Sequence, residues 1–249
     1  MVRVAPALAA LNLLAATAAL PSSGRAQTRP ATGRIEGTVV ISNTLAARRA
    51  AFRIYNEPGT GGTPPAPRDA RGSEVRNVVV YLEGDTTVLA ASPDRMQRAR
   101  HGTMAQRDER FVPHVLPVLV GATVDFPNDD EFYHNVFSLS TPAGAKGFDL
   151  GRYPRGSSKS WTFERLGNVQ VFCHIHQDMS ASVLVLANPY FASPGGDRRY
   201  VIDDVPEGDY TIVGWHDRAS PVVKRVHVTA GQTSPIDFNI PVPPSGKGG

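Results

Sequence analysis

The amino-acid sequence predicts an all-β protein, and two observations carry this prediction. The 249-residue chain contains 23 glycines and 21 prolines, and no helical period persists beyond its first twenty residues. Short runs rich in valine, isoleucine and aromatic residues alternate instead with turn-forming residues. With 41% hydrophobic residues, the chain has enough apolar material for one or two domains with sizeable cores.

Residues 1–26 are expected to form a secretory signal. Arg3 precedes the apolar run Pro6–Leu20, and Gly24-Arg25-Ala26 offers small residues at the cleavage positions. A retained membrane anchor is the alternative, although the apolar run is short for a membrane span. Removing Arg3 and Arg25 lowers Lys+Arg from 26 to 24 against 23 acidic residues, so the net charge falls from +3 to +1. We therefore expect a periplasmic or secreted protein without a transmembrane anchor, and charge gives no reason to expect a nucleic-acid partner.

In the first third of the chain, the sequence predicts few strands and long irregular stretches. Strands are expected at Arg34–Ile41 and Val75–Glu83, with a weaker one near Ala51–Tyr55. Residues 57–73 form a Gly/Pro-rich loop. The arginine-rich stretch Pro93–Arg110 is either a solvated face or a docking patch for an acidic partner.

The remainder is dense in predicted strands. Phe111–Val120 and Ala122–Phe126 are expected to form a strand pair, Phe132–Ser138 carries His134 at its start, and Thr141–Gly156 is expected to be a loop. The Pro/Gly-rich tail, residues 243–249, is expected to be disordered. Further strands are predicted at Ser158–Phe163, Val169–Cys173, Ala181–Ala187, Arg198–Ile202, Tyr210–Trp215, Val222–Val228 and Pro235–Ile240.

One tight loop carries the residues that suggest chemistry. Cys173, the only cysteine, is followed three residues later by His176 and three further on by Met179. A thiolate, an imidazole and a thioether are soft ligands that suit copper, and a His₂Cys set with a weak axial Met is the electron-transfer arrangement. A free thiol, an intermolecular crosslink and a buried apolar cysteine are the alternatives. Core packing is the alternative for Met179.

His134 is the candidate for the missing second histidine, because it follows a turn at a strand end and a β-sandwich can bring two such loops together. A purely structural histidine is the alternative. The order His-Asn, about forty residues, then Cys-x-x-His-x-x-Met resembles the cupredoxins, above all amicyanin and plastocyanin. The resemblance covers roughly residues 75–190, and it implies a Greek-key β-sandwich with one type 1 copper per chain. It also implies ligands at His134, Cys173, His176 and Met179, a loop-tying asparagine at Asn135, and an apolar docking surface that Phe132 and Ile175 could help to form.

The C-terminal part resembles a different β-sandwich family. The segment from Gly196, with its Val-Pro-x-Gly-x-Tyr turn and a later Ala-Gly-Gln-Thr turn, is similar to the carboxypeptidase regulatory-like, transthyretin-like domains. About fifty residues are few for an independent core. We therefore expect a discontinuous smaller sandwich formed by residues 33–84 and 196–242, with the cupredoxin at 85–190 inserted. The alternative gives residues 75–83 to the cupredoxin as its first strand.

Together these features predict an exported blue copper protein that carries single electrons between redox partners, such as a cytochrome or a dehydrogenase, and that is not an enzyme. The alternatives are a non-blue copper protein or metalloenzyme with an open metal position, and an assembly module with a secondary copper site. His174 is expected to point away from the metal, since side chains alternate along a strand. His114 is expected to be a half-exposed strand histidine.

Overall fold

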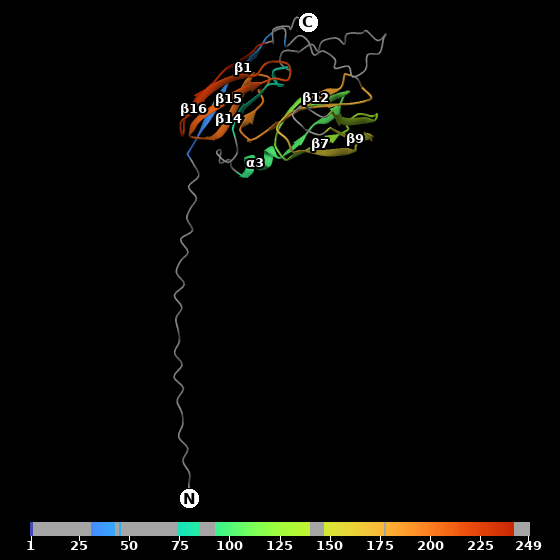
Figure 1. Ribbon diagram of the computed structural model, residues 1–249, viewed down its shortest axis with the longest axis horizontal. Helices are drawn as coiled ribbons and strands as arrows, with labels where there is room; N and C mark the ends of the chain where they lie inside the picture. The colour runs from blue at the N-terminus through green and yellow to red at the C-terminus, as the bar shows by residue number, and fades with distance from the viewer. Residues whose placement is uncertain are drawn as a thin grey trace.

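The computed structural model describes residue 1 and residues 31–42, 45, 74–84, 93–139, 147–176 and 178–241 (Figure 1). Apart from residue 1, the expected signal at residues 1–26 lies outside the described residues. The weak strand at Ala51–Tyr55, the loop at 57–73 and the tail at 243–249 lie outside them as well. Among the described residues, no helix is long and apolar enough to cross a membrane.

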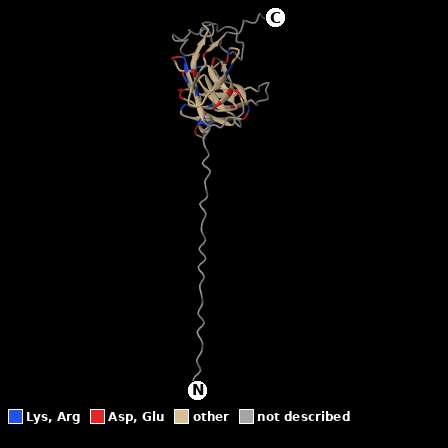
Figure 2. Cartoon of the chain, turned by 90° about the vertical axis from the view of Figure 1, so that its left-hand side faces the viewer, with Lys and Arg blue, Asp and Glu red and all other residues tan. Residues whose placement is uncertain are grey.

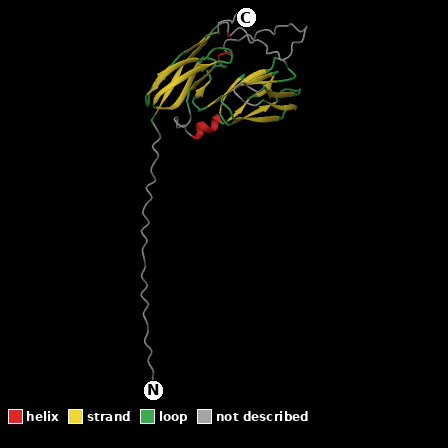
Figure 3. Cartoon of the chain, in the orientation of Figure 1, coloured by secondary structure: helices red, strands yellow, loops and turns green. Residues whose placement is uncertain are grey.

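The all-β prediction is confirmed, because strands make up nearly all the regular structure that is described (Figure 3). The strands fall into two groups that lie side by side, each with its own buried apolar core (Figure 1). We call them the metal-side sandwich and the terminal sandwich.

The metal-side sandwich contains a five-stranded sheet in the order β6-β12-β11-β8-β9 and a three-stranded sheet in the order β10-β7-β3, with the small hairpin β4-β5 beside them. Its core includes Phe126, Val136, Val171 and Val183, none of them exposed. The strands are β3 (His101–Thr103), β4 (Ala105–Arg107), β5 (Arg110–Val112), β6 (Val115–Leu119), β7 (Ala122–Pro127), β8 (His134–Ser138), β9 (Phe148–Tyr153), β10 (Ser158–Phe163), β11 (Gly167–Phe172) and β12 (Ser180–Leu186).

The terminal sandwich draws its strands from both ends of the described chain. One sheet runs β14-β1-β17 with β18 also paired to β1, and the other runs β13-β2-β15-β16. Residues from all parts of it meet in one core, in which Ile35, Leu82, Ile202 and Ile212 are almost fully buried. The strands are β1 (Thr32–Ile41), β2 (Val79–Leu82), β13 (Phe191–Ala192), β14 (Arg199–Pro206), β15 (Gly208–Trp215), β16 (Val222–Val228), β17 (Thr233–Pro235) and β18 (Phe238–Ile240).

The two sandwiches touch through an apolar cluster and through a short helix. Val79 of β2 packs with Val115, Leu184 and Leu186 of β6 and β12. Helix α3 (Pro93–Ala99) lies where the two groups meet, and its Arg95 donates to the carbonyl of Asp203 at 2.6 Å. Asp94 in the first turn of α3 and Arg98 in the last turn complement the helix dipole.

Two expectations about the metal-side sandwich are wrong in detail. The stretch at Thr141–Gly156, expected as a loop, contains β9, an edge strand whose outward side chains are charged and which includes a glycine. The sequence therefore lacks the alternation of a half-buried strand. β6 and β7 are both strands but do not pair with each other. Between them Gly121 has a φ of +79°, and the turn there sends the chain into the other sheet.

Candidate metal centre

The residues predicted to bind metal lie where two neighbouring strands end. β8 begins at His134, and β11 ends one residue before Cys173. The two strands are antiparallel neighbours, with Phe172 opposite Phe137. The alternation of β11 turns Val169 and Val171 into the core, so the strand delivers Cys173 into the buried end of the sandwich.

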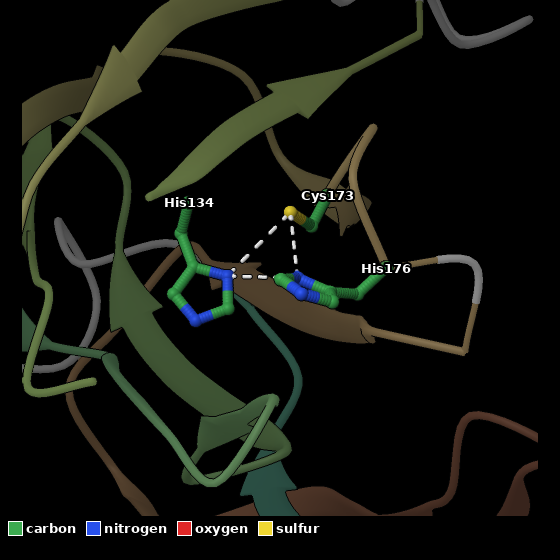
Figure 4. Close-up of side chains that lie close together, drawn as sticks. All are labelled: His134, Cys173 and His176. Carbon is green, nitrogen blue, oxygen red and sulfur yellow. Dashed lines mark hydrogen bonds between the residues drawn. The ribbon is translucent and has the colours of Figure 1, made fainter. Parts of the chain in front are cut away.

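Three donor atoms converge at this end of the sandwich (Figure 4). The Cys173 Sγ atom lies 3.7 Å from Nδ1 of His134 and 3.7 Å from Nδ1 of His176, and the two Nδ1 atoms are 3.1 Å apart. A point equidistant from three atoms at these separations lies about 2.0 Å from each, which is close to a metal–nitrogen bond length. The donor set therefore fits a metal ion, and a thiolate with two imidazoles suits copper.

The protonation of His134 is set from outside this triangle. Its Nε2 lies 2.8 Å from Oδ2 of Asp130, and His134 is completely buried. Because a carboxylate can only accept, Nε2 carries the proton and Nδ1 keeps its lone pair directed toward Cys173 and His176. Such a carboxylate–histidine pair fixes the tautomer and the ring orientation of a metal ligand.

Asp130 is itself held by backbone groups. Its two oxygens accept from the amides of Asp108, at 2.7 Å, and Glu109, at 3.0 Å. Burial by itself raises the pKa of Asp130, but the hydrogen bonds from Glu109, His134 and Asp108 outweigh it and hold this pKa below its usual value. Asp130 is therefore a carboxylate at neutral pH, as its role on His134 requires.

The loop that follows Cys173 is closed on itself. The amide of Cys173 donates to the carbonyl of Met179 at 3.1 Å, and the amide of Met179 donates to the carbonyl of His176 at 3.0 Å. Met179 is almost fully buried in the same core as Cys173. Partial burial, followed by the neighbouring His134, lowers the pKa of His176, which favours the neutral imidazole that a metal needs.

Asn135 joins the two metal-side loops. Its Oδ1 accepts from the amide of His174 at 2.8 Å, and its Nδ2 donates to Asp149 on β9 at 3.3 Å. Asn135 is itself buried, and both hydrogen bonds are partly shielded from water. They tie the start of β8 to the residue that follows Cys173.

One side of the cluster reaches the surface. The ring of Phe132 lies 5.1 Å from that of His134 and 5.3 Å from that of His176. Phe132 and Ile175 are 43% and 39% exposed, and His176 is half-buried. The apolar pair thus flanks the histidine that lies nearest to solvent.

Two other histidines lie outside the cluster. The ring of His174 stacks on Phe137 with a centroid distance of 3.6 Å and an interplanar angle of 3°. His114 lies 3.1 Å from Asp217, a residue of the terminal sandwich. His174 therefore faces away from the donor triangle, and His114 contributes to the contact between the sandwiches.

Sequence reasoning missed Asp130 and a second cluster of ligand-type side chains. Asp130 stands in an Asn-Asp-Asp-Glu turn in which neighbouring acids give the same sequence signal. The second cluster brings Glu74, His216 and Asp217 together in the terminal sandwich. His216 lies 142 positions from Glu74 in the sequence, so no local motif could indicate that the two residues are in contact.

With the site geometry established, the chain can be compared with known proteins. No protein family and no curated protein matches it. Similar structures include copper proteins. A reduced Cu(I) amicyanin variant at pH 4 is 24% identical over 33% of this chain and 79% of its own, with a TM-score of 0.32. Another reduced amicyanin variant is 20% identical over 43% of this chain and 97% of its own, also with a TM-score of 0.32.

A third similar structure corrects one expectation. The copper-containing nitrite reductase from Thermus scotoductus SA-01 is 27% identical over 33% of this chain and 21% of its own, with a TM-score of 0.31. The expectation that the chain is not an enzyme is therefore wrong as stated, because this similar structure is named as an enzyme. A sequence pattern of metal ligands does not distinguish a copper protein that carries electrons from a copper enzyme.

Proposed function

We propose that this protein is an exported type 1 copper protein that transfers single electrons between redox partners. The observation that carries the proposal is the convergence of Cys173 Sγ with the Nδ1 atoms of His134 and His176 around a point about 2.0 Å from each. We assign these three residues as ligands and Met179 as the axial ligand, with one copper per chain.

The chain's own residues prepare this site. Asp130 keeps the proton on Nε2 of His134, so that Nδ1 is available without rearrangement. The two backbone hydrogen bonds of the Cys173–Met179 loop, and the bond from the His174 amide to Asn135, restrain the loop. Bound copper would supply the one-electron couple. A restrained site favours fast transfer because little has to move when the charge changes.

We propose that electrons pass at the side of the cluster that faces solvent. His176 is half-buried there, beside the exposed side chains of Phe132 and Ile175. A small apolar surface suits a partner that docks weakly and separates quickly. A redox protein such as a cytochrome or a dehydrogenase is the proposed partner.

Figure 2 shows basic and acidic residues interspersed in that view of the molecule.

The domain division and the compartment belong to the same proposal. We assign residues 85–190 to the copper-binding domain and residues 33–84 with 196–242 to a transthyretin-like sandwich. The shared core of β1, β2, β14, β15 and β18 supports this division. We propose a periplasmic or secreted location on the basis of the signal-like residues 1–26.

The deciding experiment is copper loading of the purified mature protein. We expect one copper per chain by elemental analysis and an intense blue absorption after oxidation, arising from the Cys173 thiolate bound to copper. A colourless copper complex would contradict the type 1 assignment. Mixing the reduced protein with an oxidised cytochrome should then produce rapid electron exchange.

A further inference from the structure

The hairpin formed by β4 and β5 turns through an unusual pair of residues. Arg107 lies opposite Arg110, so Asp108 and Glu109 form a two-residue turn. Their φ angles are +52° and +55°, as a type I′ turn requires. Glycine, asparagine and aspartate are the usual occupants of such positions, so Glu109 is the unusual residue of the pair. A strained turn of this kind persists only when the surrounding structure over-determines it.

The contacts of the turn show what over-determines it. Its two amides point at one side chain: the Asp108 amide donates to Oδ1 of Asp130 and the Glu109 amide donates to Oδ2. The carboxylate is therefore gripped through both oxygens. The same Oδ2 accepts from Nε2 of His134, which has no exposure to solvent.

The hairpin is also fastened to the loop that carries Asp130. The Asp129 amide donates to the carbonyl of Gln106 at 2.9 Å, and Gln106 is completely buried. Arg107 pairs with the side chain of Asp129 at 2.7 Å. The β4 side of the turn is thus held against the segment leading into β8.

We propose that the β4–β5 turn positions the metal ligand His134, with Asp130 as the intermediate. Asp108 and Glu109 act through their backbone amides, so their side chains are dispensable. Positive φ directs both amides at Asp130 and fixes the plane of its carboxylate, which in turn fixes the ring of His134. The inference rests on the proposed function, since it gives the turn a part in preparing a copper site.

Two double variants of the full-length protein test this. Asp108→Gly/Glu109→Gly keeps both amides in a turn that glycine adopts without strain. Asp108→Val/Glu109→Val removes the same two carboxylates but places β-branched residues where positive φ is a severe outlier. Because the charge change is identical in the two variants, a difference between them reports on the backbone of the turn.

The first measurement uses the metal-free protein. We expect slow hydrogen exchange at the amides of residues 108 and 109, and a resolved proton resonance for Nε2 of His134, in the wild type and in the glycine variant. Both signatures should be lost in the valine variant. Because no metal is involved, this result stands or falls separately from the copper assignment.

The second measurement is Cu(II) affinity by competition with a chelator. The valine variant should bind about 10- to 100-fold more weakly than the glycine variant, the usual effect of losing an outer-shell partner of a ligand. Equal affinities together with equal exchange behaviour would overturn the proposal. Equal losses in both variants would overturn it too, because they would assign the effect to the side chains.

A valine variant that fails to fold leaves two further comparisons. Glu109→Val against Glu109→Gly repeats the design at one position. In an otherwise wild-type background, replacing Asp130 by Asn should speed exchange at one of the two amides of residues 108 and 109, because the Asn side chain keeps one accepting oxygen and its amide nitrogen cannot accept a hydrogen bond. Fast exchange at both amides already in the wild type would refute the proposed contact.

Discussion

Among the residues that the structure describes, two largely buried clusters of ligand-type side chains occur, one in each sandwich, and they differ in where their lone pairs point. In the metal-side cluster, Cys173 and the Nδ1 atoms of His134 and His176 face one another at 3.1–3.7 Å. In the terminal sandwich, Nε2 of His216 lies 3.1 Å from Glu74, and Nδ1 of His216 accepts from the Arg218 amide at 3.1 Å.

The second cluster already contains a positively charged side chain, that of Arg218. The Arg218 guanidinium pairs with Glu74 at 2.5 Å and donates to the carbonyl of Leu45 at 2.6 Å. Both ring nitrogens of His216 therefore have protein partners, and Glu74 already carries a positive neighbour. Residue types alone do not make a metal site. The lone pairs of the ligand atoms must point at one common position, and they must not already accept hydrogen bonds from the protein.

Replacing Cys173 by Ser should have the largest effect on the metal side. We expect the blue absorption of the copper-loaded protein to disappear, because no thiolate remains to donate charge to the metal. Glu74→Gln is the control in the other cluster and should leave the absorption unchanged. Loss of the band in the Glu74 variant would show that the two clusters are coupled.

Arg218→Met should affect stability and not metal binding. Removing Arg218 takes a positively charged partner away from the buried Glu74 carboxylate, and we expect the free energy of unfolding to fall by about 3 kcal/mol. Denaturant unfolding measures this value. Arg225→Met, which removes an exposed hydrogen bond to Thr211, should change stability by less than about 0.5 kcal/mol. Equal effects would mean that the buried pair contributes no more than a surface contact.

Copper itself should stabilise the fold through the metal-side cluster alone. At a free copper concentration of about 100 times Kd, the free energy of unfolding should rise by about 2.7 kcal/mol. His134→Ala should abolish this gain, whereas His216→Ala should retain it despite a less stable metal-free protein. A gain that depends on His216 would identify the terminal cluster as the metal site.

Met179→Leu should produce a smaller change. The two side chains have similar volumes, so the buried core should lose less than about 1.5 kcal/mol. We expect copper to stay bound. Its reduction potential should rise, because the weak axial thioether slightly stabilises the oxidised state and Leu cannot replace it. Voltammetry measures the shift. Complete loss of copper would show that Met179 does more than tune the site.

The smallest effect is expected at His174. Its ring stacks on Phe137 outside the donor triangle, so His174→Ala should leave the blue absorption nearly unchanged. His176→Ala is the matched comparison, two residues further along the same loop, and should abolish it. The opposite pattern would reverse the assignment of the two histidines.

The extent to which sequence predicts this structure differs from part to part. The strands β10 and β16 lie where the sequence predicted them, although in β10 only Phe163 is buried. The Cys-x-x-His-x-x-Met spacing pointed to Cys173 and His176, since a short loop keeps its donors close. The ligand roles of Cys173 and His176, like those of His134 and Met179, stay predictions, although the structure brings His134 to the cluster.

What sequence could not supply is contact between distant segments. Asp130 was not distinguished from Asp129, because the difference is made by the β4–β5 turn, which lies about twenty positions earlier. The pairing of Glu74 with His216 likewise depends on β2 and β15 being neighbours in one sheet. Such partners become visible only after the sheet order is known.

The apolar contact between the two sandwiches has a mechanical consequence. Val79 meets Val115, Leu184 and Leu186 across the boundary, and His114 reaches Asp217 at its edge. Buried side chains of this kind resist sliding, because any relative rotation would open voids between them. In solution the two lobes should tumble with a single rotational correlation time. A protein that binds the terminal sandwich would then hold the face around His176 at a fixed angle and distance relative to itself.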